Sequence, residues 1–265
     1  MDTSFWLKLG LSCIVGGLWV TLSTVAAERY GSKIGGFIGG LPSTVVVSLF
    51  FIGLTQTSGD ASQATTIMPL VQGFNGIFIL TYILFAARGL LVSLSGALLI
   101  WFLLASVIVA AHIQSFWIST AGWLLMALGC YAMVEKVLTI PSREKIDIHY
   151  ASLQILFRAF FGGSVIAFAV FMGKLGGPVY GGIFATFPAM FISTIIITHR
   201  TGGPQFSRAV AKTLMVSGLI NVIFYVTAAR YFYLWTGLIP GTILALLCSC
   251  GIGYLTHLFI RSRLS

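Results

Sequence analysis

Two glycine-rich runs that each end at a proline carry the residue types best suited to binding a ligand. Ser43 and Thr44 follow Pro42 directly, and Thr186 lies two residues before Pro188. Proline removes a backbone donor and glycine loosens a helix, so each apolar segment should break here. A helix that restarts after a break presents unpaired amides and a partly positive pole, which suits an anion. The runs therefore predict a substrate site at Pro42, Ser43, Thr44, Thr186 and Pro188.

Asn75 and Asn221 form a second polar pair inside apolar segments. An amide side chain is unfavourable in lipid unless it is paired, so both should face the interior of a helix bundle. Thr213, Ser217 and Asn221 follow one another at steps of four, which places them on one helix face. The pattern predicts that Asn75, Ser217 and Asn221 line a substrate path. Hydrogen bonding between helices is the alternative.

Arg158 and Lys212 are basic residues within apolar segments, each in the half nearer the expected cytoplasmic side. Ionisable groups inside a membrane mark transport paths by default, and these two would attract an anion from the cytoplasm. Both therefore join the predicted substrate site. The alternative is snorkelling, in which a long basic stem carries its charge to the membrane surface.

Residues that support catalysis or metal binding are scarce in this sequence. No acidic residue lies near the middle of an apolar segment, so ion coupling through a buried carboxylate has no evident carrier. The four cysteines form no CxxC pair, and His112 and His257 fall towards opposite membrane faces. No HExxH, GxSxG or P-loop pattern occurs. We therefore expect no enzyme, no catalytic residue, no metal and no cofactor.

The composition is that of an integral membrane protein. Hydrophobic residues make up 58% and charged residues 8% of the 265 residues, and the mean hydropathy is +1.01. Most of the Lys and Arg residues behind the net charge of +9 cluster in loops, where they set membrane orientation, so we expect no nucleic-acid partner. A bilayer core of about 30 Å needs about 20 apolar residues in a helix. This criterion predicts about nine transmembrane helices, at 4–26, 34–55, 64–86, 89–112, 116–140, 150–172, 178–198, 205–228 and 233–259.

The chain resembles itself at a spacing of 146 residues. The repeated positions are two glycine pairs, the two prolines and the two asparagines: Gly16-Gly17 with Gly162-Gly163, Gly35-Gly36 with Gly181-Gly182, Pro42 with Pro188, and Asn75 with Asn221. This spacing aligns the first four spans with the last four and leaves the fifth unmatched. The second copy should therefore enter the membrane from the opposite face, which brings the two breaks together at the midplane. Tight helix packing on glycine is the alternative role for the breaks.

The predicted fold class is all-α: a polytopic membrane helix bundle with a 4+1+4 inverted repeat. Its parts are a first four-helix repeat at 1–112, a linker helix and cytoplasmic loop at 113–149, and a second, inverted repeat at 150–265. One side would hold only the basic residues Lys8, Lys174 and Arg230, and positive residues favour the cytoplasm. We expect an outside N-terminus and a cytoplasmic C-terminus in the inner or plasma membrane. The first span has no basic stretch before it and no cleavage signature, so we interpret it as retained.

The two glycine-rich runs resemble a segment of a known family. Gly35-Gly36-Phe37-Ile38-Gly39-Gly40-Leu41-Pro42 and Gly182-Ile183-Phe184-Ala185-Thr186-Phe187-Pro188 are similar to the G-G-L-x-x-x-[LF]-P segment of small GlpM-like bacterial inner-membrane proteins. A chain of that family has about the content of one repeat here, so the resemblance implies two fused copies. It covers the first two spans of each half and brings no catalytic or ligand residues.

Taken together, these features predict a transporter or channel that moves a small anionic solute through a midplane site between inverted repeats. Two other functions stay open. One is a non-transporting accessory or scaffold protein of an envelope pathway, which a fully packed interface between the halves would favour. The other is a flippase for an anionic lipid headgroup, which would need basic residues at both entrances. The partners expected are the lipid bilayer and that anion; small-residue faces would support a homodimer, although internal pseudosymmetry does not require one.

Overall fold

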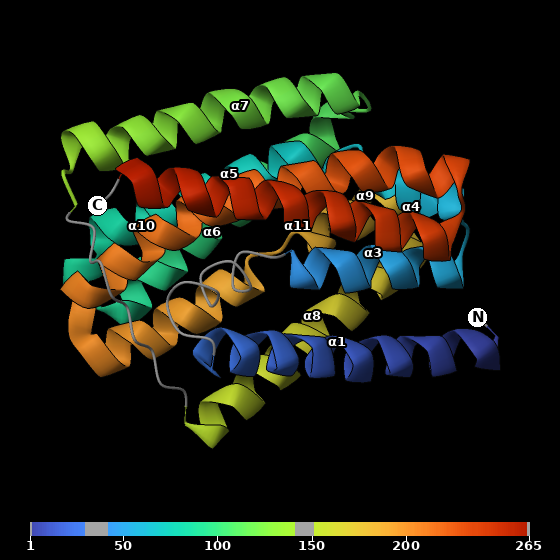
Figure 1. Ribbon diagram of the computed structural model, residues 1–265, viewed down its shortest axis with the longest axis horizontal. Coiled ribbons are helices and arrows are strands. Elements are labelled where there is room, and N and C mark those ends of the chain that lie inside the picture. Colours follow the sequence, from blue (N-terminus) through green and yellow to red (C-terminus); the bar gives the residue numbers. More distant parts are fainter. Residues whose placement is uncertain (1, 30–41, 141–150, 264–265) are drawn as a thin grey trace.

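The computed structural model describes residues 2–29, 42–140 and 151–263, and the regular structure in these ranges is helical (Figure 1). The glycines before Pro42 and the predicted cytoplasmic loop at 141–149 lie outside the described residues. The longer helices are α1 (Thr3–Arg29), α3 (Ser43–Thr55), α5 (Met68–Phe85), α6 (Leu90–Ala111), α7 (Phe116–Ala132), α8 (Ser152–Gly176), α10 (Ala189–Trp235) and α11 (Leu238–Arg263). The shorter ones are α4 (Ser58–Ala64), α9 (Pro178–Ala185), the 3-10 turn η1 (Ala86–Arg88) and the π turn η2 (Met133–Val137).

Seven stretches of helix in the described ranges are long and apolar enough to span a membrane, which confirms the prediction of an all-α membrane bundle. α9 and α10 count as one stretch, Pro178–Trp235, although the backbone turns within it at Gly203, where φ is 76°. α3 has 13 residues and is too short to be counted. The count of about nine spans and the 4+1+4 arrangement therefore stay predictions.

α1 and α8 cross at glycines that occupy equivalent places in the two copies. A side-chain carbon at Gly17 would lie 3.0 Å from the backbone oxygen of Ala159, and one at Gly163 would collide with the backbone oxygen of Cys13. The two contacts are equivalent, because adding 146 to Gly17 gives Gly163 and adding 146 to Cys13 gives Ala159. Residue numbers rise along α1 as they fall along α8 at the crossing, so the two helices run in opposite directions (Figure 1). Only glycine permits backbones to approach this closely.

A second crossing joins α5 to the C-terminal half of α10. The Gln72 side-chain amide donates to the backbone carbonyl of Gly218 at 3.0 Å, and these residues are 146 positions apart. They are thus the same position in the two copies. α7 packs on the outer side of α5, where Met126 covers Gly73, and the buried rings of Tyr82 and Trp101 lie in the core between α5, α6 and α10.

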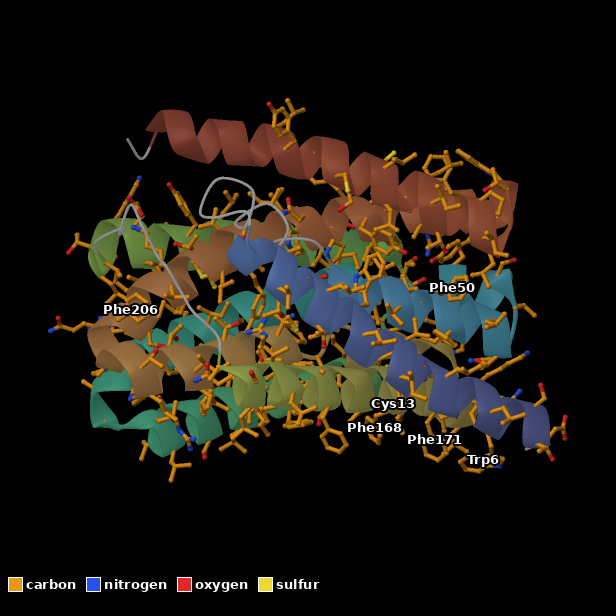
Figure 2. The ribbon with its side chains drawn as sticks, turned by 60° about the horizontal axis from the view of Figure 1, so that its bottom comes forward. Trp6, Cys13, Phe50, Phe168, Phe171 and Phe206 are labelled. Carbon is orange, nitrogen blue, oxygen red and sulfur yellow. The ribbon has the colours of Figure 1, made fainter. Side chains whose placement is uncertain are left out.

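Large apolar side chains cover the outside of the bundle. Trp6 of α1 and Phe168 and Phe171 of α8 lie along one side of it (Figure 2), with the Trp6 and Phe171 rings 6.3 Å apart. Leu91 of α6 and Leu125 of α7 are 81% and 74% exposed. An apolar exterior around helices that satisfy their own backbone groups is the arrangement that lipid requires.

Candidate functional site

α3 and α10 begin in the same way at the two predicted breaks. Pro42 has φ −75° and ψ 54°, and Pro188 has φ −75° and ψ 39°. The carbonyl of each proline accepts the first helical bond at 2.9 Å, from the amides of Val46 and Ile192 respectively. The backbone amides of the residues between each proline and that first donor have no acceptor within their own helix. Both prolines therefore mark a fresh helix N-terminus inside the protein, as the sequence predicts.

The two helix starts point towards each other from opposite directions. α3 ends near Leu238 at the start of α11, where a side-chain carbon at Gly53 would meet the Leu238 side chain. The first half of α10 instead ends near the end of α5, where the Tyr82 hydroxyl lies 2.8 Å from Nδ1 of His199. These are opposite ends of the bundle (Figure 1). The positive poles of both helices are thus directed at the space between them.

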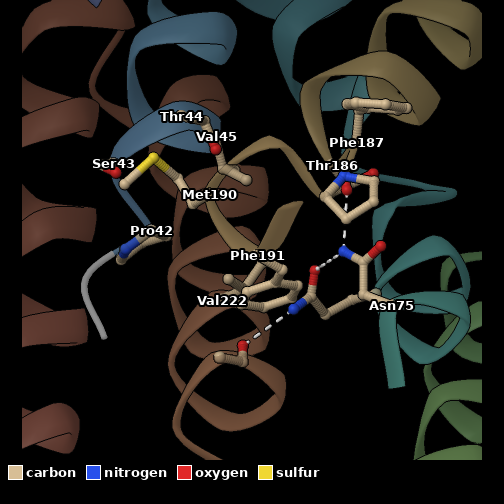
Figure 3. A pocket seen from close by; sticks show the side chains of 13 residues that line it. Pro42, Ser43, Thr44, Val45, Asn75, Thr186, Phe187, Met190, Phe191 and Val222 are labelled. Carbon is tan, nitrogen blue, oxygen red and sulfur yellow. Dashed lines mark hydrogen bonds between the residues drawn. The ribbon is translucent and has the colours of Figure 1, made fainter. Parts of the chain in front are cut away.

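That space is a cavity of about 60 Å³. Eight of its thirteen lining residues form four pairs spaced by 146 residues: Pro42 with Pro188, Thr44 with Met190, Val45 with Phe191, and Gln72 with Gly218. The others are Ser43, Asn75, Thr186, Phe187 and Val222 (Figure 3). The cavity therefore lies where the two copies meet, between the two breaks.

A chain of side-chain amides forms one wall of the cavity. Trp101 Nε1 donates to Asn75 Oδ1 at 2.9 Å, and Asn75 Nδ2 donates to Gln72 Oε1 and to the Thr186 carbonyl, both at 2.9 Å. Gln72 then donates to the carbonyl of Gly218 (Figure 3). The Thr186 carbonyl belongs to the break after α9, so Asn75 supplies the partner that the broken helix leaves missing.

Gln72 also lines the cavity, although it is not among the site residues predicted from the sequence. Its counterpart in the second copy is a glycine, so it does not stand out in the repeat. The available signal was its place three residues before Asn75, on the same helix face, in a segment that is otherwise apolar. Both side chains are 2% exposed.

Arg158 lies beside the cavity without lining it. Arg158 is 5% exposed, and its Nη1 donates to the Thr194 hydroxyl at 2.6 Å. Nη2 lies 4.0 Å from the sulfur of Met190, which is a lining residue. Thr194 follows Met190 by one helical turn, so the positive charge sits about one turn, roughly 5 Å, along α10 from the cavity.

Three other predicted residues lie elsewhere. Lys212 Nζ is 2.7 Å from a carboxylate oxygen of Glu135 in η2, and this ion pair ties α10 to the end of α7. The Ser217 hydroxyl donates to a carbonyl of its own helix at 3.0 Å. Asn221 is buried, and its backbone carbonyl accepts a bond from Ser249. Of the ten predicted site residues, the structure brings six together around the cavity: Pro42, Ser43, Thr44, Asn75, Thr186 and Pro188.

Comparison with known proteins also finds the 146-residue repeat. A family described as "Protein of unknown function (DUF3147)" matches residues 9–114 and again residues 155–258, so its second match begins 146 residues after the first. No curated protein and no solved structure matches the chain. The two matches are consistent with two fused copies of a small protein. The chain belongs to the DUF3147 family.

Proposed function

We propose that this protein is a small membrane transporter or channel, and that a small anion passes through the cavity between its two helix breaks. The observation that carries the proposal is that α3 and α10 both begin at this cavity, from opposite directions. Discontinuous helices whose N-termini face an anionic group near the bilayer midplane are a recurrent feature of transporters with inverted repeats.

The proposal includes opposite orientations for the two copies in the membrane. The antiparallel crossing of α1 and α8 supports this, because its glycine contacts are exchanged by the 146-residue spacing. The bond between Gln72 and Gly218, at one repeated position, supports a pseudo-twofold axis through the cavity. A 4+1+4 arrangement with α7 as the unmatched helix accounts for both. The proposal also includes an outside N-terminus and a cytoplasmic C-terminus, which the distribution of basic residues favours, and descent from a GlpM-like ancestor.

The charges and donors around the cavity support an anionic solute. The described lining residues include no acidic side chain, and two helix N-termini supply amide donors there. Arg158 adds a full positive charge about one helical turn away. Flipping of an anionic lipid fits less well, because Arg230 at the expected outer side already donates to the Thr66 hydroxyl at 2.9 Å. The scaffold function would leave the cavity without a role.

Uptake of nitrate by vesicles that contain the purified protein tests the proposal, with potassium and valinomycin present to balance charge. Arg158→Gln should lower uptake about thirtyfold, because a unit charge about 8 Å from the anion contributes about 2 kcal/mol at an effective dielectric constant of about 20, and about 1.4 kcal/mol corresponds to a factor of ten. Lys212→Gln is the matched control. It removes a cation of similar burial that pairs with Glu135 away from the cavity, so uptake should change little while the unfolding midpoint falls.

Two outcomes of this assay count against the proposal in different ways. Uptake by the wild-type protein no faster than in protein-free vesicles, for every small anion offered, would contradict transport and favour the scaffold function. Equal losses in Arg158→Gln and Lys212→Gln would show that the effect comes from stability and not from charge near the cavity.

A further inference from the structure

The hydrogen-bond directions along the cavity wall are fixed by groups that cannot exchange roles. The Trp101 indole can only donate, whereas the Thr186 and Gly218 carbonyls can only accept. Asn75 must therefore turn its oxygen to Trp101 and its NH₂ group to Thr186. Gln72 must in turn receive the second Asn75 proton on Oε1 and donate from Nε2 to Gly218.

One N–H donor of these side-chain amides is left over. Both N–H groups of Asn75 are in use, but the Gln72 amide carries two and donates one of them to Gly218. The described residues offer no partner to the second, and Gln72 lines the cavity at 2% exposure. The wall therefore presents a buried hydrogen-bond donor to whatever occupies the cavity. An occupant that accepts hydrogen bonds satisfies it.

The charge that the contact groups supply matches one negative charge. A helix N-terminus acts as about half an elementary charge, and two of them face this cavity. No ionisable side chain is among the described residues that line it. A monovalent anion is thus balanced by the groups it touches. A divalent anion would exceed the charge of the groups it touches, and Arg158, about one helical turn away, would compensate the remainder only in part.

The size of the cavity sets an upper limit on the occupant. A cavity needs a volume of about 10–15 Å³, on the same measure, to hold one water molecule. The cavity of about 60 Å³ therefore takes about four or five non-hydrogen atoms. Nitrate and formate fit within this limit, and sulfate is only slightly larger, so size alone separates them poorly.

We infer that the cavity selects a single small monovalent anion over a divalent anion of similar size, and that the second amide proton of Gln72 is the side-chain donor that binds this anion. The inference rests on the proposed function and deepens it. Asn75 and Trp101 are positioning residues, because they act on the anion only by holding Gln72 in one orientation.

Concentration-dependent uptake of nitrate, formate and sulfate by vesicles containing the full chain tests this inference. The wild-type protein should carry nitrate and formate at least about tenfold better than sulfate. Gln72→Met keeps the length of the side chain but removes the donor, so the KM for nitrate should rise about ten- to a hundredfold, the effect of losing a hydrogen bond to a charged group. Ser217→Ala, whose hydroxyl bonds within its own helix off the cavity, is the matched control and should keep the wild-type KM.

A purely structural role for Gln72 would reduce the amount of active protein, which lowers the maximal rate and leaves the KM unchanged. A KM that stays at the wild-type value in Gln72→Met therefore overturns the role of Gln72. Sulfate uptake equal to that of nitrate overturns the selectivity. In both cases the proposed anion transport stands. Absence of uptake for all three anions overturns the proposed function and this inference together.

Discussion

Replacing Asn75 with leucine should destabilise the folded bundle by about 3 kcal/mol, because three buried groups lose their partner at about 1 kcal/mol or more each. These are the indole N–H of Trp101, the carbonyl of Thr186 and the side-chain oxygen of Gln72. Leucine has a similar volume, so the loss comes from unsatisfied polar groups and not from a void. Denaturant titration in detergent micelles, followed by tryptophan fluorescence, measures the change.

Ser217→Ala is the appropriate control for this measurement as well. Its hydroxyl bonds to its own helix, and the change should cost less than about 0.5 kcal/mol, as is usual away from buried networks. An Asn75→Leu protein as stable as Ser217→Ala would mean that the amide chain contributes nothing to the fold, and the described hydrogen bonds would then need another explanation.

Blocking the cavity should abolish transport. Thr44 lies in the first turn of α3 and lines the cavity. In a chain whose four native cysteines have been replaced, Thr44→Cys treated with methyl methanethiosulfonate gains a thiomethyl group, which would fill much of a space of about 60 Å³. Nitrate uptake should then fall to the level of protein-free vesicles and recover on reduction with dithiothreitol.

Leu125→Cys is the control for that experiment, because this residue of α7 is 74% exposed on the apolar exterior. Its modification should leave uptake unchanged. Mass spectrometry establishes that each cysteine has reacted. Full modification of Thr44→Cys without loss of uptake would place the transport path elsewhere.

The sequence contains much of what locates the cavity. Apolar segment lengths predict most helix bounds, since helix length follows from the thickness of the lipid core. Proline and glycine act locally on the backbone, so the breaks at Pro42 and Pro188 could be read directly. The 146-residue spacing then predicts that the breaks are equivalent, and both line one cavity in the structure.

The partners of single polar side chains could not be read in the same way. Whether Lys212 faces a substrate path or Glu135 depends on how α10 is rotated and on the π turn that ends α7, and neither has a local sequence signal. Asn75 and Asn221 look equivalent in sequence, yet only Asn75 lines the cavity. Its donor Trp101 has Leu247 at the repeated position, so the second copy lacks that bond.

The two copies have thus diverged around a shared cavity. Arg158 in the second copy corresponds to Ser12 in the first, and Gln72 in the first copy corresponds to Gly218 in the second. The second half of α10 is continuous, whereas the first copy is interrupted between α4 and α5. Fusion of two copies into one chain allows such differences, because each position can then change without its counterpart. The cavity is consequently built from paired backbone features and unpaired side chains.

Opposite membrane orientation of the two copies is tested most directly by a pair of equivalent cysteines. Gly59 and Gln205 are both exposed and lie 146 residues apart, beside the α3–α4 turn and the turn within α10. In a cysteine-free chain expressed in cells, we predict that Gly59→Cys reacts with a membrane-impermeant maleimide added outside, and that Gln205→Cys reacts only after the membrane is permeabilised. Labelling of both cysteines from the same side would contradict inverted copies, and with them a cavity formed by two opposed helix N-termini at the midplane.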